Sequence, residues 1–261
     1  METSAIEHAA ELLVRARREV RQLDGLPSDC TPRTLQDAYA VQERVVELLG
    51  EPVDGWLLGL TNSYMQAVFG VAGPYFARLL RSGHMNGPAT VSAACFCTRG
   101  LECEVAFRMG ADLPPRGRQY SAEEVAVAVA AAQPVIEIVN AHFADWMNAP
   151  LPLIVADNGT DGLLIVGPPV SDWRSLDLSR MSVSLAVNGT PVAQGDSGRA
   201  MGSPLVALTW LANILNQRGL WLRCGDLINT GTCTEIHFAE AGDVATAKFA
   251  GLGEVRVAFS R

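Results

Sequence analysis

A glutamate in the middle of an apolar, β-branched run constrains the fold more than any other feature of the sequence. Residues 135–139 read VIEIV, with Glu137 at the centre. β-Branched residues favour strands, and a continuous apolar run is typical of a strand that is buried on both faces. A buried, ionised carboxylate is costly unless a positive partner compensates it. We therefore expect Glu137 to contact either an arginine or a metal ion.

A second predicted strand carries two more glutamates on one face. Residues 101–109 read LECEVAFRM, so Glu102 and Glu104 share one face and the apolar side chains share the other. Taken alone, this pair is more typical of the solvated face of an antiparallel strand. Together with Glu137, however, three carboxylates could form an oxygen cage for a divalent cation.

Composition excludes several classes of function. The chain has 261 residues, 49% of them hydrophobic, and a net charge of −8, which argues against a nucleic-acid partner. No apolar stretch is long enough to span a bilayer and no signal peptide is visible, so no membrane association is expected. The six cysteines show no zinc-type spacing, which favours reduced thiols and a cytoplasmic location.

The pattern of apolar residues predicts an α+β fold, with a helical region at about 1–50 and a β-rich, metal-binding core at about 55–261. No linker or internal repeat divides the chain, so a single catalytic domain over 1–261 is expected. Ser4 and Glu7 predict a capping box, and Thr34 and Gly50 bound a second helix. Further helices are expected at 121–132 and 203–219, and strands at 55–60, 88–97, 101–109, 134–140, 162–167, 181–188, 226–230, 245–250 and 254–259.

An ordered set of short motifs resembles a known family. The chain is similar to the 2-hydroxypenta-2,4-dienoate hydratase and 4-oxalocrotonate decarboxylase family, within the fumarylacetoacetate hydrolase superfamily. The resemblance implies a mixed β-roll and an Mg²⁺ or Mn²⁺ site at Glu102, Glu104 and Glu137. It also implies a 2-oxo acid substrate that reacts through an enolate. The motifs are DAYAVQ at 37–42, GLT at 59–61, ECEVAF at 102–107, PVIEIV at 134–139, ADN at 156–158 and GDLINTG at 225–231.

The chain departs from this family where the acid–base groups are expected. The resemblance implies a lysine at the position of Leu57 and an acidic residue at the position of Tyr75, and it implies a serine where this chain has Asp161. Leucine cannot transfer a proton, so Leu57 is expected only to face the substrate. Tyr75 is expected to act as a general acid, since tyrosine has an unperturbed pKa of about 10.

Two other residues are candidates for proton transfer, and two for substrate binding. Asp161 and His142 are the acid–base candidates, although a turn aspartate and a buried histidine are the more usual roles of such residues. The resemblance implies that Thr160 and Thr230 contact the substrate, although loop hydroxyls are also ordinary turn chemistry.

The leading functional hypothesis is a metal-dependent lyase of hydratase or decarboxylase type, active as a homo-oligomer on a small 2-oxo acid or enol. A cyclase or isomerase is an alternative, because a cage without the lysine suits a substrate that brings its own acid or base. A non-catalytic subunit of a hydratase and decarboxylase complex is the third possibility. Retention of three costly carboxylates argues against that role.

Overall fold

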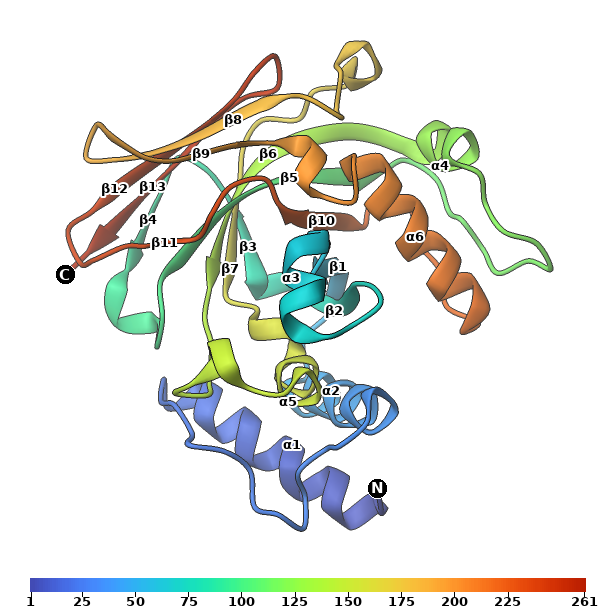
Figure 1. Ribbon diagram of the computed structural model, residues 1–261, viewed down its shortest axis with the longest axis vertical. Coiled ribbons are helices and arrows are strands. Elements are labelled where there is room, and N and C mark those ends of the chain that lie inside the picture. The colour runs from blue at the N-terminus through green and yellow to red at the C-terminus, as the bar shows by residue number, and fades with distance from the viewer.

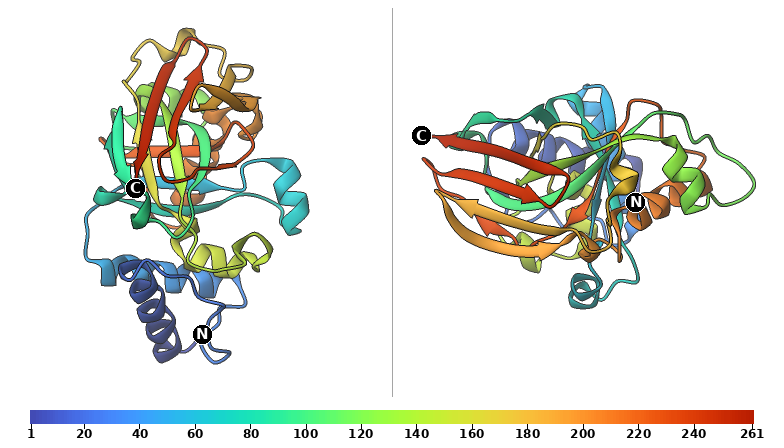
Figure 2. Two further views of the ribbon diagram at one scale, coloured as in Figure 1. Left: turned by 90° about the vertical axis from the view of Figure 1, so that its left-hand side faces the viewer. Right: turned by 90° about the horizontal axis from the view of Figure 1, so that it is seen from above.

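A computed structural model describes all residues, 1–261. The N-terminal helices form one end of the molecule, and two curled sheets form the other (Figures 1 and 2). Of the helices, none combines the length and the apolar character needed to cross a membrane. The helices are α1 (Thr3–Arg18), α2 (Leu35–Leu49), α3 (Ser63–Phe69), α4 (Ala122–Ala128), α5 (Leu151–Ala156) and α6 (Pro204–Gln217).

The larger sheet has eight strands and carries the predicted site. Its order is β2-β1-β10-β5-β6-β7-β3, and β11 pairs with β5. Parallel and antiparallel pairs occur together, since β1 runs parallel to β10 while β5 runs antiparallel to both β10 and β6. Its strands are β1 (Val53–Gly59), β2 (Tyr75–Leu80), β3 (His84–Asn86), β5 (Gly100–Met109), β6 (Val129–Val139), β7 (Leu163–Val166), β10 (Leu227–Thr232) and β11 (His237–Phe238).

The smaller sheet packs against the larger one and encloses the main core. Its order is β4-β13-β12-β8-β9. The buried apolar face of β5, including Leu101, Val105 and Phe107, belongs to the same core cluster as Leu185 and Val257 of the smaller sheet. Its strands are β4 (Ala89–Ser92), β8 (Ser182–Val187), β9 (Thr190–Asp196), β12 (Val244–Phe249) and β13 (Gly253–Ser260).

A second apolar core fastens the helical region to the sheets. Leu13 of α1, Val41 of α2 and Ile154 of α5 belong to this cluster, which also includes Tyr75 of β2. These contacts bring α1, more than 50 residues upstream in sequence, close to the edge of the sheet that carries the site. The α+β fold with an N-terminal helical region is therefore confirmed.

Three of the predicted elements differ in the structure. The Ser4–Glu7 capping box is wrong, because α1 begins at Thr3 and its N-cap, Glu2, makes no side-chain cap. The helix predicted at 121–132 ends at Ala128, and the chain continues directly as β6, since pairing with β5 outweighs the helix propensity of the alanines there. The strand predicted at 88–97 covers only Ala89–Ser92.

Three boundaries, belonging to two helices, were predicted correctly from their capping residues. Thr34 accepts a hydrogen bond from the Asp37 N–H at the start of α2, and Gly50 ends that helix with φ 71°. Ser203 likewise caps α6 at its first turn. Both follow the usual preference for short polar residues at the N-cap, and α2 also follows the preference for glycine after the last turn.

Candidate active site

The three predicted glutamates meet on one face of the larger sheet. Glu102 of β5 lies directly opposite Glu137 of β6 in the antiparallel register, and Glu104 follows two residues later on the same face. One carboxylate oxygen from each residue lies within 4.8 Å of the others. The cluster is therefore a direct consequence of strand alternation and register.

Burial makes these three negative charges costly. Glu104 and Glu137 are only 1% and 7% exposed, and Glu102 is half-buried. Burial raises the pKa of Glu102 to about 7, and burial together with the charge of Glu102 raises that of Glu137 to about 8. The pKa of Glu104 is also raised well above its usual value, by burial and then by the other two charges.

The protein supplies polar partners to the cluster but no cationic side chain. The Asn229 amide donates to Glu137 Oε2 at 2.7 Å, and the Gly231 N–H donates to Glu104 Oε2 at 2.5 Å. No arginine is paired with Glu137, so the sequence-based alternative of a buried Arg–Glu pair is wrong. An all-oxygen donor set without a neighbouring cationic side chain fits a hard divalent cation.

The cluster lies in a cavity of about 560 Å³. Leu57 and Tyr75 line it together with the glutamates, and so does Thr160. Half of the lining residues are hydrophobic, which suits a substrate with an apolar part. Apolar side chains come from α3, from the 3₁₀ turn Trp146–Asn148 and from α5, among them Met65, Val68, Trp146, Met147, Leu151 and Ile154.

Comparison with known proteins agrees with this geometry. Residues 80–260 match the family described as fumarylacetoacetate (FAA) hydrolase C-terminal. The chain is 32% identical to 2-keto-4-pentenoate hydratase of Paraburkholderia xenovorans, over 97% of this chain and 94% of that protein. It is 31% identical to 2-hydroxyhexa-2,4-dienoate hydratase of Comamonas testosteroni, over 98% and 97%.

The chain belongs to the fumarylacetoacetate hydrolase family. A solved structure of 4-oxalocrotonate decarboxylase from Pseudomonas putida G7, complexed with magnesium and adipate, superposes with a TM-score of 0.92 at 26% identity. The match covers 99% of this chain and 98% of the decarboxylase. This family member is therefore a metal-dependent lyase of the hydratase and decarboxylase type.

Tyr75 is held in this family member's cavity by two glycines. Its hydroxyl donates to the Gly159 carbonyl at 3.2 Å. A Cβ at Gly59 would lie 2.0 Å from the tyrosine ring and one at Gly159 would lie 2.8 Å away, so both positions must be glycine for the ring to fit. Burial, followed by the charges of Glu137 and Glu102, raises the pKa of Tyr75 well above its usual value. The hydroxyl therefore keeps its proton at neutral pH.

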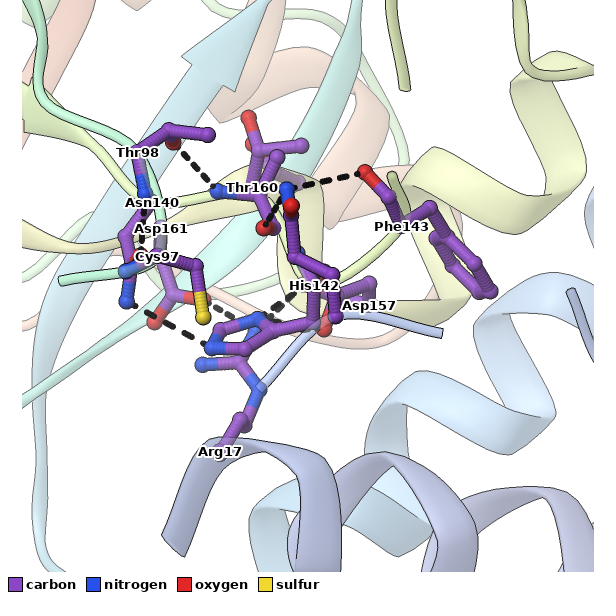
Figure 3. A network of polar contacts seen from close by, with 12 residues as sticks. Arg17, Cys97, Thr98, Asn140, His142, Phe143, Asp157, Thr160 and Asp161 are labelled. Atoms are coloured by element: carbon purple, nitrogen blue, oxygen red, sulfur yellow. Dashed lines mark hydrogen bonds and ion pairs between the residues drawn. The ribbon is translucent and has the colours of Figure 1, made fainter. Parts of the chain in front are cut away.

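Three predicted site residues do not line the cavity. His142 is buried, with its Nδ1 3.1 Å from Asp157 Oδ2, and Asp161 is paired with Arg17 at 2.5 Å. Figure 3 shows His142, Asp157, Asp161 and Arg17 in one network. Thr230 donates to the Val105 carbonyl at 2.6 Å. These contacts satisfy the three side chains away from the cavity, so their predicted roles in proton transfer and substrate contact have no support in this geometry.

Two groups next to the glutamates were not predicted from the sequence. Asn229 lies in the buried strand β10 and is 0% exposed, and its Oδ1 has no partner. Gly231 sits at an irregularity in the β10–β5 pairing, with φ 101°, where a Cβ would lie 1.8 Å from Thr61 Oγ1. Only two apolar residues, Leu227 and Ile228, precede Asn229, and polar residues and a glycine follow it. The sequence therefore offered no signal here as strong as the apolar run around Glu137.

Proposed function

We propose that this lyase binds Mg²⁺ or Mn²⁺ at Glu102, Glu104 and Glu137 and acts on a 2-oxo acid or its enol. The buried carboxylate cluster at the cavity carries the proposal. The related decarboxylase structures contain magnesium or calcium, and two relatives are hydratases of short 2-oxo or 2-hydroxy acids.

A bound cation would supply Lewis-acid stabilisation of negative charge that develops next to the breaking bond. The protein's own groups would do the rest. The Tyr75 hydroxyl carries a proton, which it donates to the Gly159 carbonyl, and the glycines on either side of its ring fix the place of this hydroxyl in the cavity. In the proposed role, that proton passes to the substrate. Leu57 offers no proton and presents an apolar surface to the substrate.

The outer cavity favours a substrate with one anionic end and an apolar remainder. Arg199 is the only cationic residue in the lining, and it lies 3.6 Å from Glu235. A second substrate carboxylate would therefore have to compete with Glu235 for that arginine. The apolar side chains of α3 and α5 suit a hydrocarbon substituent instead.

A cyclase or isomerase is the second candidate function, and Leu57 is the observation that favours it. Leucine occupies the position where the resemblance implies a lysine, so proton transfer within the substrate would need no such group. The non-catalytic subunit considered from the sequence has no observation in its favour. A homo-oligomeric state and a cytoplasmic location stay predictions.

Calorimetry with oxalate tests the proposal, because oxalate resembles the planar enolate of pyruvate. We expect oxalate to bind only when Mg²⁺ or Mn²⁺ is present. Glu137→Gln should lower the affinity for the cation by at least about 10-fold, since even groups that only support metal ligands typically contribute about 10–100-fold. The matched control is Glu235→Gln, which changes the same residue type in the same cavity but outside the cluster. Equal oxalate binding without the cation would contradict the proposal.

A further inference from the structure

The turn after α5 has an unusual backbone. Three consecutive residues, Asn158, Gly159 and Thr160, have positive φ values of 51°, 76° and 62°. For a β-branched residue such as Thr160 this conformation is a true outlier. A non-glycine residue in this conformation is strained and persists only where its surroundings enforce it. The contacts around this turn therefore need an explanation.

One group of contacts ties the turn to the sheet. The Asn158 side chain accepts from the Arg78 N–H at 3.0 Å and donates to the Arg78 carbonyl at 2.8 Å. The Thr160 carbonyl accepts from the Asn140 N–H at 3.0 Å. These bonds hold the middle and the end of the turn against β2 and the end of β6.

Arg17 of α1 holds the turn from the other side. Its Nη2 contacts the carbonyl oxygen of Asp157, Asp157 Oδ1 at 3.0 Å and Asp161 Oδ1 at 2.5 Å. Asp157 and Asp161 immediately flank the three positive-φ residues, so one guanidinium joins both ends of the turn (Figure 3). The Arg17 side chain is 12% exposed and that of Asp157 is fully buried, where an ion pair is weakly screened.

The opposite side of the turn faces the cavity. Gly159 and Thr160 line it, and the Gly159 carbonyl accepts from both the Tyr75 hydroxyl and the Thr160 hydroxyl. Gly159 also packs so closely on the Tyr75 ring that no Cβ fits between them. A displacement of the turn would therefore displace the Tyr75 hydroxyl.

We propose that Arg17 is a positioning residue for the cavity: by holding Asp157 and Asp161 together, it fixes the turn that orients the Tyr75 hydroxyl. The expected loss of catalysis without Arg17 rests on the proposed function, but the expected displacement of the Tyr75 hydroxyl does not. Arg17 reaches no cavity-lining atom itself and acts through Gly159.

Two measurements on Arg17→Gln test this. First, ¹³C-tyrosine NMR of the metal-free protein reports on Tyr75 directly, and its signal among the four tyrosines is identified by its loss in Tyr75→Phe. We expect the Tyr75 signal to shift or broaden. Second, we expect kcat to fall about 10–100-fold with a smaller change in KM, because a misplacement of about 1 Å can cost about 100-fold.

Arg44→Gln is the matched control. Arg44 of α2 binds Glu7 of α1 at 2.6 and 2.8 Å, so its loss loosens the helical region without touching the turn. It should leave the Tyr75 signal and kcat unchanged. Arg17→Lys should restore part of both, because all three contacts come from a single nitrogen that an ammonium can partly replace.

An unchanged Tyr75 signal in Arg17→Gln, or an equal shift in Arg44→Gln, would overturn the proposal. If Arg17→Gln does not fold, Asp161→Asn is the substitute variant, because it removes the charge from one of the three Arg17 contacts. We expect it to shift the Tyr75 signal. An unchanged signal in this variant counts against the role of Arg17. If the unmodified chain shows no lyase turnover, the proposed function fails, and the NMR result still decides the role of Arg17.

Discussion

At the scale of single residues, two of the three departures from the family pattern, Leu57 and Tyr75, lie side by side. In the β1–β2 register Leu57 is opposite Ala77 and Gly59 is opposite Tyr75, so Leu57 and Tyr75 are diagonal neighbours on one face. Both line the cavity with the glutamates. The positions where the resemblance implies a lysine and an acid are therefore adjacent in space, and the chain has replaced both.

Restoring both groups should change the reaction. We expect the unmodified chain to hydrate 2-hydroxypenta-2,4-dienoate poorly, and Leu57→Lys with Tyr75→Asp to raise that rate, since a positioned acid or base typically supplies about 10²–10⁴-fold. The unmodified chain should still catalyse slow, metal-dependent deuterium exchange at C3 of a 2-oxo acid, because the cation alone can polarise the ketone. Leu57→Met is the control, because it keeps the volume and adds no proton donor. Hydration by the unmodified chain at ordinary enzyme rates would show that the lysine is not needed.

At the scale of elements, α1 is held to the site region by a buried charge network. Asp157 is fully buried and is contacted by Arg17 at 3.0 Å and by the His142 N–H at 3.1 Å. Burial alone would raise the pKa of Asp157, but His142 and Arg17 outweigh it and hold the pKa below its usual value. The ionised aspartate therefore stabilises the folded protein.

This stabilisation should depend on pH. Since the pKa of Asp157 is lower in the folded than in the unfolded protein, its contribution is present above its unfolded pKa of about 3.9 and is lost as pH falls through the folded pKa. Asp157→Asn should cost about 3 kcal/mol at pH 7, and the difference from the unmodified protein should shrink below about pH 4.

Urea unfolding between about pH 3 and 7 would measure this difference. Asp161→Asn is the control, because the pKa of Asp161 shifts in the opposite direction: burial raises it despite the nearby Arg17. Its stability difference from the unmodified protein should not widen as pH rises. A constant difference for Asp157→Asn across the pH range would refute the assignment of an ionised, stabilising Asp157.

At the scale of the whole molecule, the cavity mouth exposes apolar side chains. Helix α3 has no buried residue, and it stands away from the sheets in Figure 2. Tyr64 and Val68 on this helix are 73% and 60% exposed, and Met147 nearby in the lining is 53% exposed. Exposed apolar side chains at the rim of a cavity are typical of surfaces that contact another protein chain or a ligand.

We therefore expect a homo-oligomer. Sedimentation at micromolar concentration should give a mass that is a multiple of the 27.9 kDa chain, and closed symmetry is the common outcome for such assemblies. A charged substitution at the rim, such as Val68→Glu, should weaken the assembly, whereas Val127→Glu, at a still more exposed site on α4, should not. A single species of 27.9 kDa would contradict the prediction.

The single-domain prediction for residues 1–261 can be tested with the urea unfolding curves described above. One cooperative transition is expected.

Local periodicity along the chain was enough to predict several features of the protein. The alternation of polar and apolar residues predicted that Glu102 and Glu104 share one face of a strand. The apolar run around Glu137 predicted a buried carboxylate. Short polar residues and glycines located the ends of α2 and α6. Arg17, which follows Leu13 and Val14 at helical spacing, was not singled out from the sequence.

Only the tertiary structure decided which partner each of these residues has. Residues 129–132 form a strand because β5 lies beside them, and Arg17 meets Asp157 and Asp161 across 140 and 144 residues of sequence. His142 and Asp161 were candidates for proton transfer beside Tyr75, and their partners in the buried network became known only from the structure. Local pattern sets which face a side chain occupies, whereas pairing register and chain packing determine what lies opposite that face.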